Sequence, residues 1–269
     1  MKLITLLTDF GLRDGYVGVM KGVIWTICPD AHIADLTHTV APQNIRQGAL
    51  ALALSFPYYP AGSVHVAVVD PGVGTARRPI AARVGDHYFV APDNGLLSPV
   101  FDEAERQGWP ADIVHLNRPQ YWLDDISHVF HGRDIFSPVA AHLARGIPLE
   151  ALGDPITDPL RFTLPVAEAF DGGLRGAILL VDNYGNLYSN IPLKALEPYD
   201  PARLRIRIAG QEITGLVPSF GYGNEGDLVA VHGTYGSLTV AVVNGNAAKR
   251  LFAGVDTPLE VHFNLEQPA

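Results

Sequence analysis

The sequence predicts an α/β fold in two domains: an N-terminal layered α/β domain with a mostly parallel central sheet, and a smaller C-terminal antiparallel β-barrel domain. Strand-like and helix-like segments alternate through the first part of the chain, which is typical of a layered α/β sheet. Pro155, Pro159 and the pair Gly172–Gly173 then interrupt this pattern. Short strand-like segments separated by turn signals follow, as in a barrel. We place the domains at residues 1–168 and 169–269.

Apolar runs predict the elements of the N-terminal domain. The stretch LITLLT at 3–8 is expected to be a strand buried on both faces of a sheet. A helix follows over 15–27, with Val19, Val23 and Ile27 on one face. The later elements are a strand at 32–37, a helix at 44–56, a strand at 65–70, two strands joined at Gly85–Asp86, a helix at 97–106, a strand at 112–117 and a helix at 134–145.

The C-terminal domain is predicted to be almost entirely β-structure. Its apolar segments are short, are rich in β-branched residues and are separated by glycine-containing turns. Helical periodicity is confined to a stretch at 192–197. The expected strands lie within the segments 174–182, 204–215, 227–245 and 258–263.

Composition narrows the classes of function. The net charge of −9 argues against binding nucleic acid through a broad basic surface. The apolar run after Lys2 is only five residues long, which is too short for a signal sequence or a membrane span. We therefore expect a cytoplasmic protein with no membrane segment. Cys28 is the only cysteine, so no intramolecular disulfide can form, and we expect it to be a small buried residue.

Three polar segments follow predicted strands, and ligands of α/β sheets bind where strands end. The segment TDFGLRDGY at 8–16 contains Asp9 and Asp14. The segment HVAVVDPGVGTARRPI at 65–80 contains Asp70 and adjacent arginines at 77 and 78. The segment SHVFHGRDIF at 127–136 contains His131. Since several reactive side chains arrive at strand ends together, these segments are the candidate functional site.

General motifs do not assign a chemistry to these segments. The turn at 8–16 has too few glycines for a dinucleotide fingerprint, and GVGTARR lacks the GK[ST] of a P-loop. The sequence has no HExxH and no paired CxxC, and GSL at 236–238 is not a nucleophile elbow. His128 and His131 have helical spacing but no third ligand, so no metal site is predicted.

Each candidate also has a purely structural interpretation. Asp70 before Pro-Gly can shape a turn, Arg77 can be a surface charge, and His131 can pack or cap a helix. Asp9 can hold a turn or cap the following helix. We expect Asp134 to be the N-cap of the helix at 134–145. Asp182 and Asn186, in VDNYGNLYSN, can be hairpin-turn residues.

Six motifs in series make the interpretation more specific. They are TDFG-x-x-D-G-Y-V, ICPDAHIADLTH, VVDPGVGT-x-R-R, APDNGLL, FHGRDIF-x-PVAAHLA and VDNYGN-x-x-SNI. In this order they resemble the S-adenosyl-L-methionine (SAM) hydroxide adenosyltransferase family, which is related to the SAM-dependent fluorinase and chlorinase. The resemblance extends from Thr8 to about Ala248. It implies the same two-domain architecture.

The resemblance implies hydrolysis of SAM by in-line displacement at the ribose C5′, with adenosine and L-methionine as products and no cofactor. The hydroxide branch has an Asp-Arg-His set, which matches Asp70, Arg77 and His131. A carboxylate can accept the proton of water, a guanidinium can stabilise hydroxide, and an imidazole can orient the water or relay its proton. The spacing favours Arg77 over Arg78. The halogenases carry tyrosine at the position of Asp70, which makes Asp70 the best discriminator.

The resemblance also implies contacts with the substrate. Asp9 matches the carboxylate that holds the ribose hydroxyls, and Asp14 and Asp182 match acids near the methionine moiety. Asn186 matches the amide that contacts the adenine edge. Phe220 is expected to line the adenine pocket, or else to be a buried core residue.

The sequence departs from the fluorinase pattern at other substrate positions. Tyr16 replaces a serine at the methionine end, and Gln43 stands where the fluorinase has a tryptophan. Thr234 and Tyr235 replace a Ser-Arg pair. We keep Tyr16, Thr234 and Tyr235 as candidate substrate residues.

The resemblance further implies a homotrimer whose active sites lie between the N-terminal domain of one subunit and the C-terminal domain of its neighbour. SAM and adenosine are then the expected small-molecule partners, with no nucleic acid and no membrane. Two alternative functions stay open from the sequence: a halogenase of the same fold, and a non-catalytic protein that binds adenosine or SAM. Asp70 argues against the first, and the complete Asp70, Arg77 and His131 set argues against the second.

Overall fold

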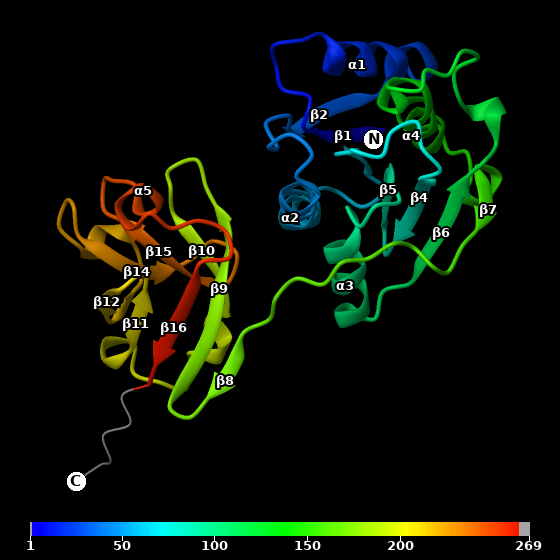
Figure 1. The fold of residues 1–269 in the computed structure, drawn as a ribbon. Coiled ribbons are helices and arrows are strands. Elements are labelled where there is room, and N and C mark those ends of the chain that lie inside the picture. The colour runs from blue at the N-terminus through cyan, green and yellow to red at the C-terminus, as the bar shows by residue number, and fades with distance from the viewer. Residues whose placement is uncertain (1, 264–269) are drawn as a thin grey trace. The chain divides into compact units, whose positions relative to one another are not determined.

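The computed structural model describes residues 2–263 of the 269-residue chain. The chain divides into two compact units, Met1–Thr163 and Leu164–Ala269 (Figure 1). This division lies five residues before the boundary that we placed at 168. The first unit is mixed α/β and the second is built mainly from strands, in agreement with the predicted fold class.

The N-terminal unit alternates strands with helices as expected. Its regular elements are β1 (Leu3–Thr8), α1 (Tyr16–Ile27), β2 (His32–Thr37), α2 (Ile45–Ser55), η1 (Phe56–Tyr58), β3 (Val64–Val68), β4 (Pro79–Val84), β5 (His87–Pro92), α3 (Ser98–Gln107), β6 (Ala111–Leu116), η2 (Pro119–Tyr121), η3 (Gly132–Phe136), α4 (Ser137–Ala144), η4 (Leu149–Ala151) and β7 (Gly153–Pro155). The ends of α2 and α3 follow local chemistry. Asn44 caps α2 by accepting the Gln47 N–H at 3.0 Å, and Gly108 ends α3 in the left-handed conformation.

The strands of this unit form one sheet in the order β2-β1-β3-β5-β4-β6-β7. Strands β2, β1, β3 and β5 pair in parallel, and the later pairs are antiparallel. Since β6 is antiparallel to β4, it runs in the same direction as β5. The sheet is therefore largely parallel, and the carboxyl ends of β1, β3 and β5 lie next to one another at one edge.

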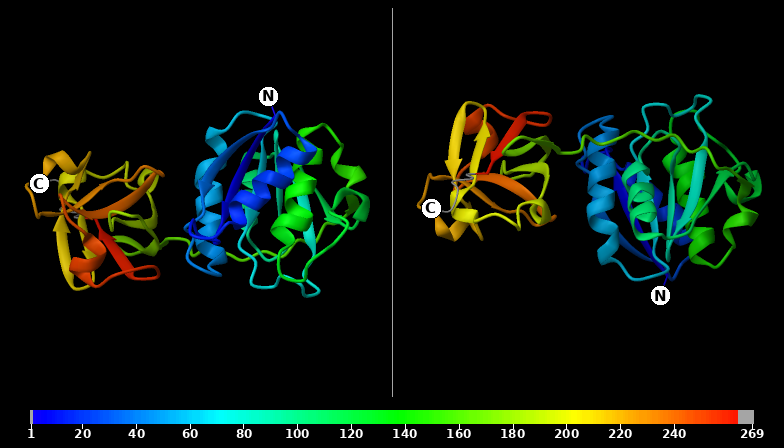
Figure 2. Two further views of the ribbon diagram at one scale, coloured as in Figure 1. Left: turned by 90° about the horizontal axis from the view of Figure 1, so that it is seen from above. Right: turned by 90° about the horizontal axis from the view of Figure 1, so that it is seen from below.

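Helices cover both faces of this sheet (Figure 2). One core contains the buried residues of α1 and α4, and a second core contains those of α2 and α3. Within α1 the buried side chains are Val17, Met20 and Ile24. The predicted face was wrong, because Val19 is exposed and Val23 and Ile27 are only partly buried. Cys28 follows this helix and is buried, as predicted.

The C-terminal unit is a single strongly curved sheet, close to a closed barrel. Its elements are β8 (Glu168–Phe170), β9 (Gly173–Val181), β10 (Leu187–Pro192), η5 (Leu193–Ala195), η6 (Pro201–Arg203), β11 (Arg205–Ile208), β12 (Gln211–Thr214), β13 (Leu216–Val217), η7 (Phe220–Tyr222), β14 (Leu228–His232), β15 (Ser237–Val242), α5 (Ala247–Leu251) and β16 (Pro258–His262). The strand order is β12-β11-β16-β9-β10-β15-β14-β13, with β8 on β9. All pairs are antiparallel except β13 with β14.

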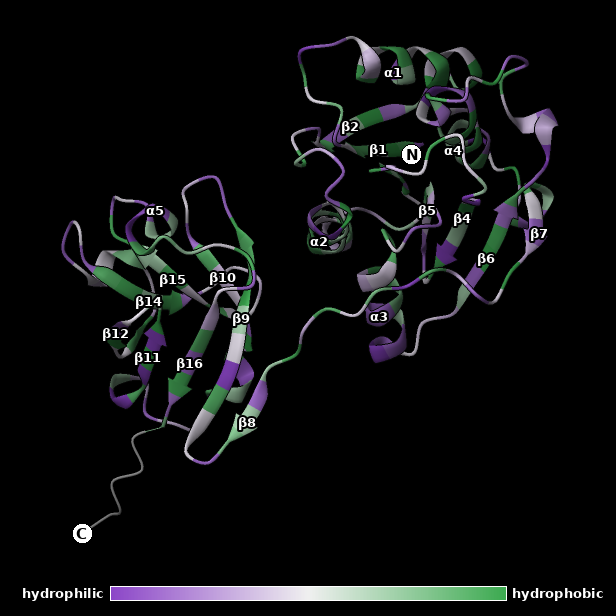
Figure 3. Ribbon diagram, viewed as in Figure 1, coloured by the Kyte–Doolittle hydropathy of each residue, from purple (hydrophilic) through white to green (hydrophobic). Residues whose placement is uncertain are grey.

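Hydropathy reflects the position of each strand. Strand β1 is largely hydrophobic and buried on both faces, whereas β11 mixes arginine with isoleucine (Figure 3). Ile206 and Ile208 of β11 face the barrel core, while Arg205 and Arg207 pair with Glu212 on β12. One face of this part of the barrel is therefore solvated. None of the helices between residues 2 and 263 has the length and apolarity that crossing a bilayer requires.

Candidate active site

Parallel pairing brings the first two predicted segments to the same sheet edge. Thr8, the last residue of β1, lies opposite Val68, the last residue of β3. Asp9 and Asp70 therefore leave two neighbouring strands at their carboxyl ends. This is the position where α/β sheets bind ligands.

The chain from 69 to 78, here called the site loop, is a tight turn between β3 and β4. The Val73 N–H donates to the Asp70 carbonyl at 3.2 Å, and the Thr75 N–H donates to the Gly72 carbonyl at 3.2 Å. The Thr75 hydroxyl also donates to the Gly72 carbonyl and accepts the Arg77 N–H. These bonds fold the loop back on itself and return Arg77 toward Asp70.

Asp70 and Arg77 form a bidentate ion pair. Arg77 Nε donates to Asp70 Oδ1 at 3.0 Å, and Arg77 Nη2 contacts Oδ2. The two side chains are 4% and 7% exposed, respectively. The planar guanidinium matches both carboxylate oxygens at once, which fixes the orientation of each group.

His131 joins this pair through the same guanidinium. Arg77 Nη2 lies 3.1 Å from His131 Nδ1. Because arginine only donates hydrogen bonds, Nδ1 must be the acceptor and the proton of the neutral ring must be on Nε2. Burial, followed by the charge of Arg77, lowers the pKa of His131. The ring is therefore held neutral, with an Nε2–H donor.

The structure leaves part of the Arg77 guanidinium available. Its carbon lies 5.4 Å from the centre of the Phe136 ring, which is fully buried. Arg77 Nη1 is also buried and has no hydrogen-bond partner among the described residues. A buried unpaired donor is costly unless it meets a polar group, so Nη1 is a position for a ligand oxygen. Sequence reasoning did not single out Phe136, although it lies in the FHGRDIF motif.

Burial dominates the electrostatics of Asp70. It raises the pKa of this carboxyl above its ordinary value, against the opposing effect of the Arg77 charge. A carboxylate with a raised pKa is a better proton acceptor than a free aspartate. The cluster of Asp70, Arg77 and His131 can therefore orient a water molecule and accept its proton.

Backbone packing holds His131 near the site loop. Gly74 has φ +75°, and a Cβ atom there would lie 2.1 Å from the carbonyl oxygen of His128. Only glycine allows the loop to approach the 127–131 segment this closely. His131 itself immediately precedes the π-helical turn η3, a kind of irregularity that is frequent at functional sites.

Asp134 is not a helix cap, so this prediction was wrong. Helix α4 begins at Ser137, and Asp134 lies inside η3, fully buried. Its carboxylate accepts the Ser127 N–H at 2.8 Å and pairs with Arg133. Asp134 therefore holds the 127–131 segment against η3. The sequence pattern missed this because a π-helical turn shifts the start of the regular helix.

Arg78 lies next to Arg77 but belongs to a different cluster. Arg78 Nε donates to Asp93 Oδ2 at 2.8 Å, and Nη1 and Nη2 donate to the side chain and carbonyl of Asp158. Asp93 is 2% exposed and was not singled out in the sequence. The contacts with Asp70 and His131 therefore come from Arg77, whereas Arg78 binds Asp93 and Asp158.

The residues around Asp9 lie beside His131. Asp9 Oδ2 accepts the Gln43 N–H at 2.7 Å, which occupies one side of the carboxylate and gives the backbone of Gln43 a structural role. Tyr16 is half-exposed and its ring contacts those of Phe10 and Phe130. Phe130 directly precedes His131, so Tyr16 packs against the segment that carries His131.

A buried histidine, His38, holds the turn that contains Asp9. His38 Nδ1 lies 2.9 Å from the Thr8 hydroxyl, which also accepts the Phe10 N–H. The His38 carbonyl accepts the Gly11 N–H at 2.7 Å. Asp14, at the outer end of this turn, is exposed to solvent. The turn is therefore fixed near Asp9 and open near Asp14.

In the C-terminal unit, Asp182 and Asn186 bind each other. Asp182 Oδ1 accepts the N–H groups of Tyr184 and Asn186, and Oδ2 accepts Asn186 Nδ2 at 2.8 Å and the Tyr188 hydroxyl at 3.3 Å. Both oxygens of Asp182 thus organise the turn between β9 and β10. The turn-forming interpretation of these two residues is supported by the geometry.

Tyr188 connects this turn with the predicted residues Thr234 and Tyr235. Its ring lies 5.4 Å from that of Tyr235, and the Thr234 side chain lies near its hydroxyl. Burial and the nearby charge of Asp182 raise the pKa of Tyr188. Sequence reasoning missed Tyr188, although it stands inside the VDNYGN-x-x-SNI motif. Phe220 lies in η7 and is 44% exposed, so it is not a core residue.

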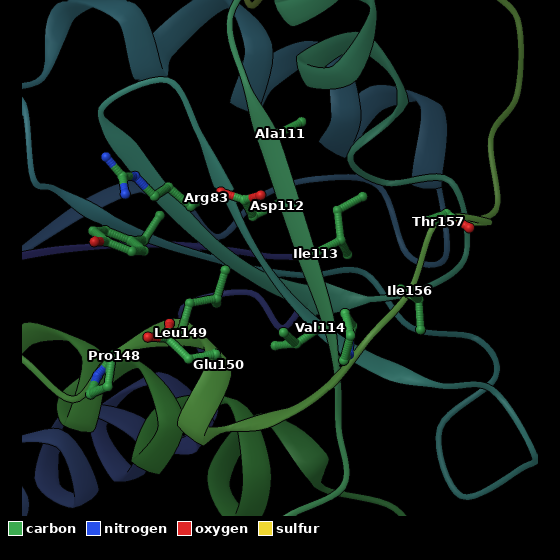
Figure 4. A pocket seen from close by; sticks show the side chains of 12 residues that line it. Arg83, Ala111, Asp112, Ile113, Val114, Pro148, Leu149, Glu150, Ile156 and Thr157 are labelled. Atoms are coloured by element: carbon green, nitrogen blue, oxygen red, sulfur yellow. The ribbon is translucent and has the colours of Figure 1, made fainter.

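A separate pocket of about 550 Å³ lies elsewhere in the N-terminal unit (Figure 4). Its lining includes Arg83 and Asp112 on the neighbouring strands β4 and β6, together with Leu149 and Glu150. None of the predicted site residues lines it. Among residues 2–263, no group of three or more His, Cys, Asp or Glu side chains is arranged to hold a metal ion.

Comparisons with known proteins agree with these observations. Models of the SAM hydroxide adenosyltransferase N-terminal and C-terminal domains match residues 4–153 and 176–260. An (R)-S-adenosyl-L-methionine hydrolase of Salinispora tropica is 41% identical, over 92% of this chain and 93% of its own. A fluorinase of Actinoplanes is 28% identical, over 89% and 90%. The crystal structure of a conserved protein of Thermotoga maritima has a TM-score of 0.90 at 36% identity, covering 96% of this chain and 99% of that chain.

Proposed function

The chain belongs to the SAM hydroxide adenosyltransferase family, and from this premise we propose that it hydrolyses SAM to adenosine and L-methionine at the Asp70, Arg77 and His131 cluster. The observation that carries the proposal is the bidentate Asp70–Arg77 pair with His131 on the same guanidinium. SAM is the substrate, and the proposal includes no cofactor.

The reaction is an in-line displacement. The water oxygen forms a bond to the ribose C5′ while the C5′–sulfur bond breaks, and the electron pair of that bond stays on sulfur. The sulfonium becomes the neutral thioether of methionine, which makes it a good leaving group. The water loses one proton, so the product is the 5′-hydroxyl of adenosine.

Asp70 is the acceptor of this proton. His131 Nδ1 is already bound by Arg77, and Nε2 carries the ring proton, so the neutral ring has no free lone pair to use as a base. The Asp70 carboxylate accepts from Arg77 and from the Gly72 backbone, which leaves a lone pair for a further donor, and burial raises its pKa. His131 Nε2–H and Arg77 Nη1 then donate to the water oxygen and orient it.

The same arrangement favours water over a halide ion. The Asp70 carboxylate repels an anion, and its bidentate contact neutralises much of the Arg77 charge that would attract one. A neutral water molecule can donate to Asp70 and accept from Arg77 at the same time. A site for halide has no use for a proton acceptor at this point.

Substrate binding is assigned from the same premise. Asp9, with one oxygen bound to the Gln43 N–H, holds the ribose hydroxyls, and Asp14 and Tyr16 lie on the methionine side. Asn186 Nδ2 is committed to Asp182, which leaves Oδ1 to accept from the adenine amino group.

The oligomer and the location are part of the proposal. We expect a homotrimer in which Asp182, Asn186, Phe220, Thr234 and Tyr235 complete the site of a neighbouring subunit. The location that we propose is the cytoplasm.

Product analysis tests the proposed function. Purified protein is incubated with SAM in buffers with and without fluoride or chloride, and the products are separated by chromatography. Adenosine and L-methionine in equal amounts, independent of halide, are expected. A 5′-halo-5′-deoxyadenosine would instead show a halogenase. Tight SAM binding by calorimetry, with only the spontaneous breakdown to methylthioadenosine, would show a binding protein and overturn the proposal.

A further inference from the structure

The topology of the sheet makes the site loop an arch. The loop joins β3 to β4, but β5 lies between these two strands in the sheet. Residues 69–78 must therefore pass over the carboxyl end of β5. The residues that leave β5, beginning with Asp93 and Asn94, lie directly at the base of this arch.

Asn94 holds the first end of the loop. Its Nδ2 donates to the carbonyl of Val69 at 2.9 Å. Val69 immediately precedes Asp70, so this bond fixes the peptide plane from which the catalytic carboxylate extends. The other end of the same amide, Oδ1, accepts the Leu96 N–H at 3.2 Å and keeps the turn after β5 in shape.

Asp93 holds the second end of the loop. Its N–H donates to the Arg78 carbonyl at 2.9 Å, and its Oδ2 pairs with Arg78 Nε and Nη2 at 2.8 and 2.7 Å. Its Oδ1 accepts the Leu160 N–H at 2.7 Å, so the carboxylate is itself held on both sides. Arg78 immediately follows Arg77, which places the second catalytic residue next to this attachment.

We propose that Asp93 and Asn94 are positioning residues that hold both ends of the site loop and so keep Asp70 and Arg77 in bidentate register. This inference rests on the proposed function and adds to it. It gives a role to the APDNGLL motif, whose hydrogen bonds to the site loop, among residues 2–263, go to Val69 and Arg78 and not to the side chains of Asp70, Arg77 or His131. Two adjacent residues on one rigid strand end set the separation of two loop ends.

Positioning of this kind matters because displacement at C5′ requires an in-line water. A shift of about 1 Å in the groups that orient a nucleophile can lower the rate by roughly 100-fold. Substrate affinity depends on Asp9 and on other groups outside the loop. Loosening the loop should therefore lower kcat much more than it weakens binding.

The main test compares Asn94→Ala with Asn117→Ala. Asn117 is a matched control, because its amide also bonds a backbone N–H and a side chain, at Asp154, but not the site loop. At a temperature where both variants are folded, Asn94→Ala should lower kcat by about 10- to 100-fold with KM changed less than about threefold. Asn117→Ala should leave both constants near those of the wild type. An equal loss in the two variants would overturn the proposal.

A second variant separates the loop attachment from the turn. Asn94→Asp keeps an acceptor for the Leu96 N–H but removes the donor to the Val69 carbonyl, so it should reproduce the loss of kcat. It also serves if Asn94→Ala does not fold. Combining it with Asp70→Asn gives a double-mutant cycle. A residue that acts through Asp70 costs little more once Asp70 is replaced, whereas fully multiplicative losses would contradict the proposal.

A measurement that does not depend on turnover can test the positioning role separately from the proposed hydrolysis of SAM. Amide hydrogen exchange of residues 69–78 should become faster in Asn94→Ala than in Asn117→Ala, with the rest of the sheet unchanged. If the wild type did not hydrolyse SAM, the proposed function would fail and this exchange result would still decide whether the loop is held. If the wild type is active and neither exchange nor kcat responds, only the positioning role is wrong.

Discussion

Two neighbouring arginines form two different kinds of ion pair. Arg77 pairs with Asp70, both side chains are almost fully buried, and one guanidinium nitrogen has no partner among the described residues. Arg78 pairs with the buried Asp93 but is itself 29% exposed, and its remaining nitrogens bind Asp158. The residue type and the partner type are the same in both cases. They differ in how fully the hydrogen-bonding capacity is used.

This difference in hydrogen bonding distinguishes a candidate functional site at Arg77 from a structural contact at Arg78. A guanidinium whose three nitrogens all have partners holds chain segments together, as Arg78 does for the segments at 93 and 158. A guanidinium with a buried free donor, beside an aspartate with a raised pKa and a neutral histidine, has capacity left for a ligand. Completeness of hydrogen bonding, more than charge or burial, assigns the two pairs to different roles.

Replacing the Asp70 carboxylate should give the largest effect. Asp70→Asn keeps an acceptor for Arg77 Nε but cannot take a proton, so kcat should fall by about 1,000-fold. Binding of adenosine, measured by calorimetry, should change little. The matched change Asp158→Asn, in the Arg78 cluster, should leave turnover within about twofold. Unchanged turnover in Asp70→Asn would remove Asp70 from the mechanism.

Exchanging each arginine for lysine should have different effects at the two ion pairs. Arg77→Lys should mainly lower kcat, and Arg78→Lys should mainly lower stability. Arg77→Lys keeps the charge but loses the bidentate contact and the bond to His131, so kcat should fall by roughly 100-fold. Arg78→Lys should retain more activity and lose stability, by about 1–3 kcal/mol, because its bonds to Asp93 and Asp158 are charge-assisted. Initial rates and urea unfolding measure both variants. Comparable losses of kcat in the two variants would show that the two ion pairs do not have different roles.

The approach of the site loop to the 127–131 segment can be tested with a pair of glycines. Gly74→Ala places a Cβ against the His128 carbonyl, whereas Gly62→Ala, at a similar positive φ, meets open space. Both should cost about 1 kcal/mol of stability from backbone conformation. Only Gly74→Ala should also lower kcat, by about tenfold, because it moves the loop away from His131. Equal kcat values would show that this contact does not position the catalytic groups.

The smallest effect is a shift of the pH profile. In the proposed mechanism the ionised form of Asp70 is the base, so kcat/KM should rise with pH through the pKa of Asp70, which burial places above its ordinary value. Arg77 opposes that shift, so Arg77→Gln should move the acid limb to higher pH. Arg78→Gln should leave the limb in place. A limb that moves to lower pH in Arg77→Gln would contradict this assignment.

The sequence was sufficient for the fold class and for the central cluster. Alternating apolar runs correctly predicted the order of strands and helices in the first unit, and the motifs led to Asp70, Arg77 and His131. The face of α1 was wrong because Val19, Val23 and Ile27 are all apolar, and apolar side chains alone did not show which side meets the sheet. Packing against α4 and the sheet selects Val17, Met20 and Ile24.

Other features depend on contacts that no local pattern contains. Asn94 and Val69 are distant in sequence and meet because β3 and β5 are neighbours in the sheet. Asp134 lies in a π-helical turn, which propensity does not predict. The hydrogen bonds of the turn at 182–186 depend on side-chain orientations that the sequence pattern does not specify. In each of these cases the role of a polar residue depends on the residues that are close to it in the folded structure.

The π-helical turn after His131 suggests how a change in chain length could disrupt this site. Such a turn accommodates one residue more than a regular α-helical turn. Deleting one residue between 132 and 136 would convert this turn into a regular α-helical turn and would leave the segments on either side in nearly the same register. The Phe136 ring, which lies against the Arg77 guanidinium, would then be lost or would stand one position nearer His131 along the chain. A single residue of length would therefore separate two chains that share the same helix but support the site differently.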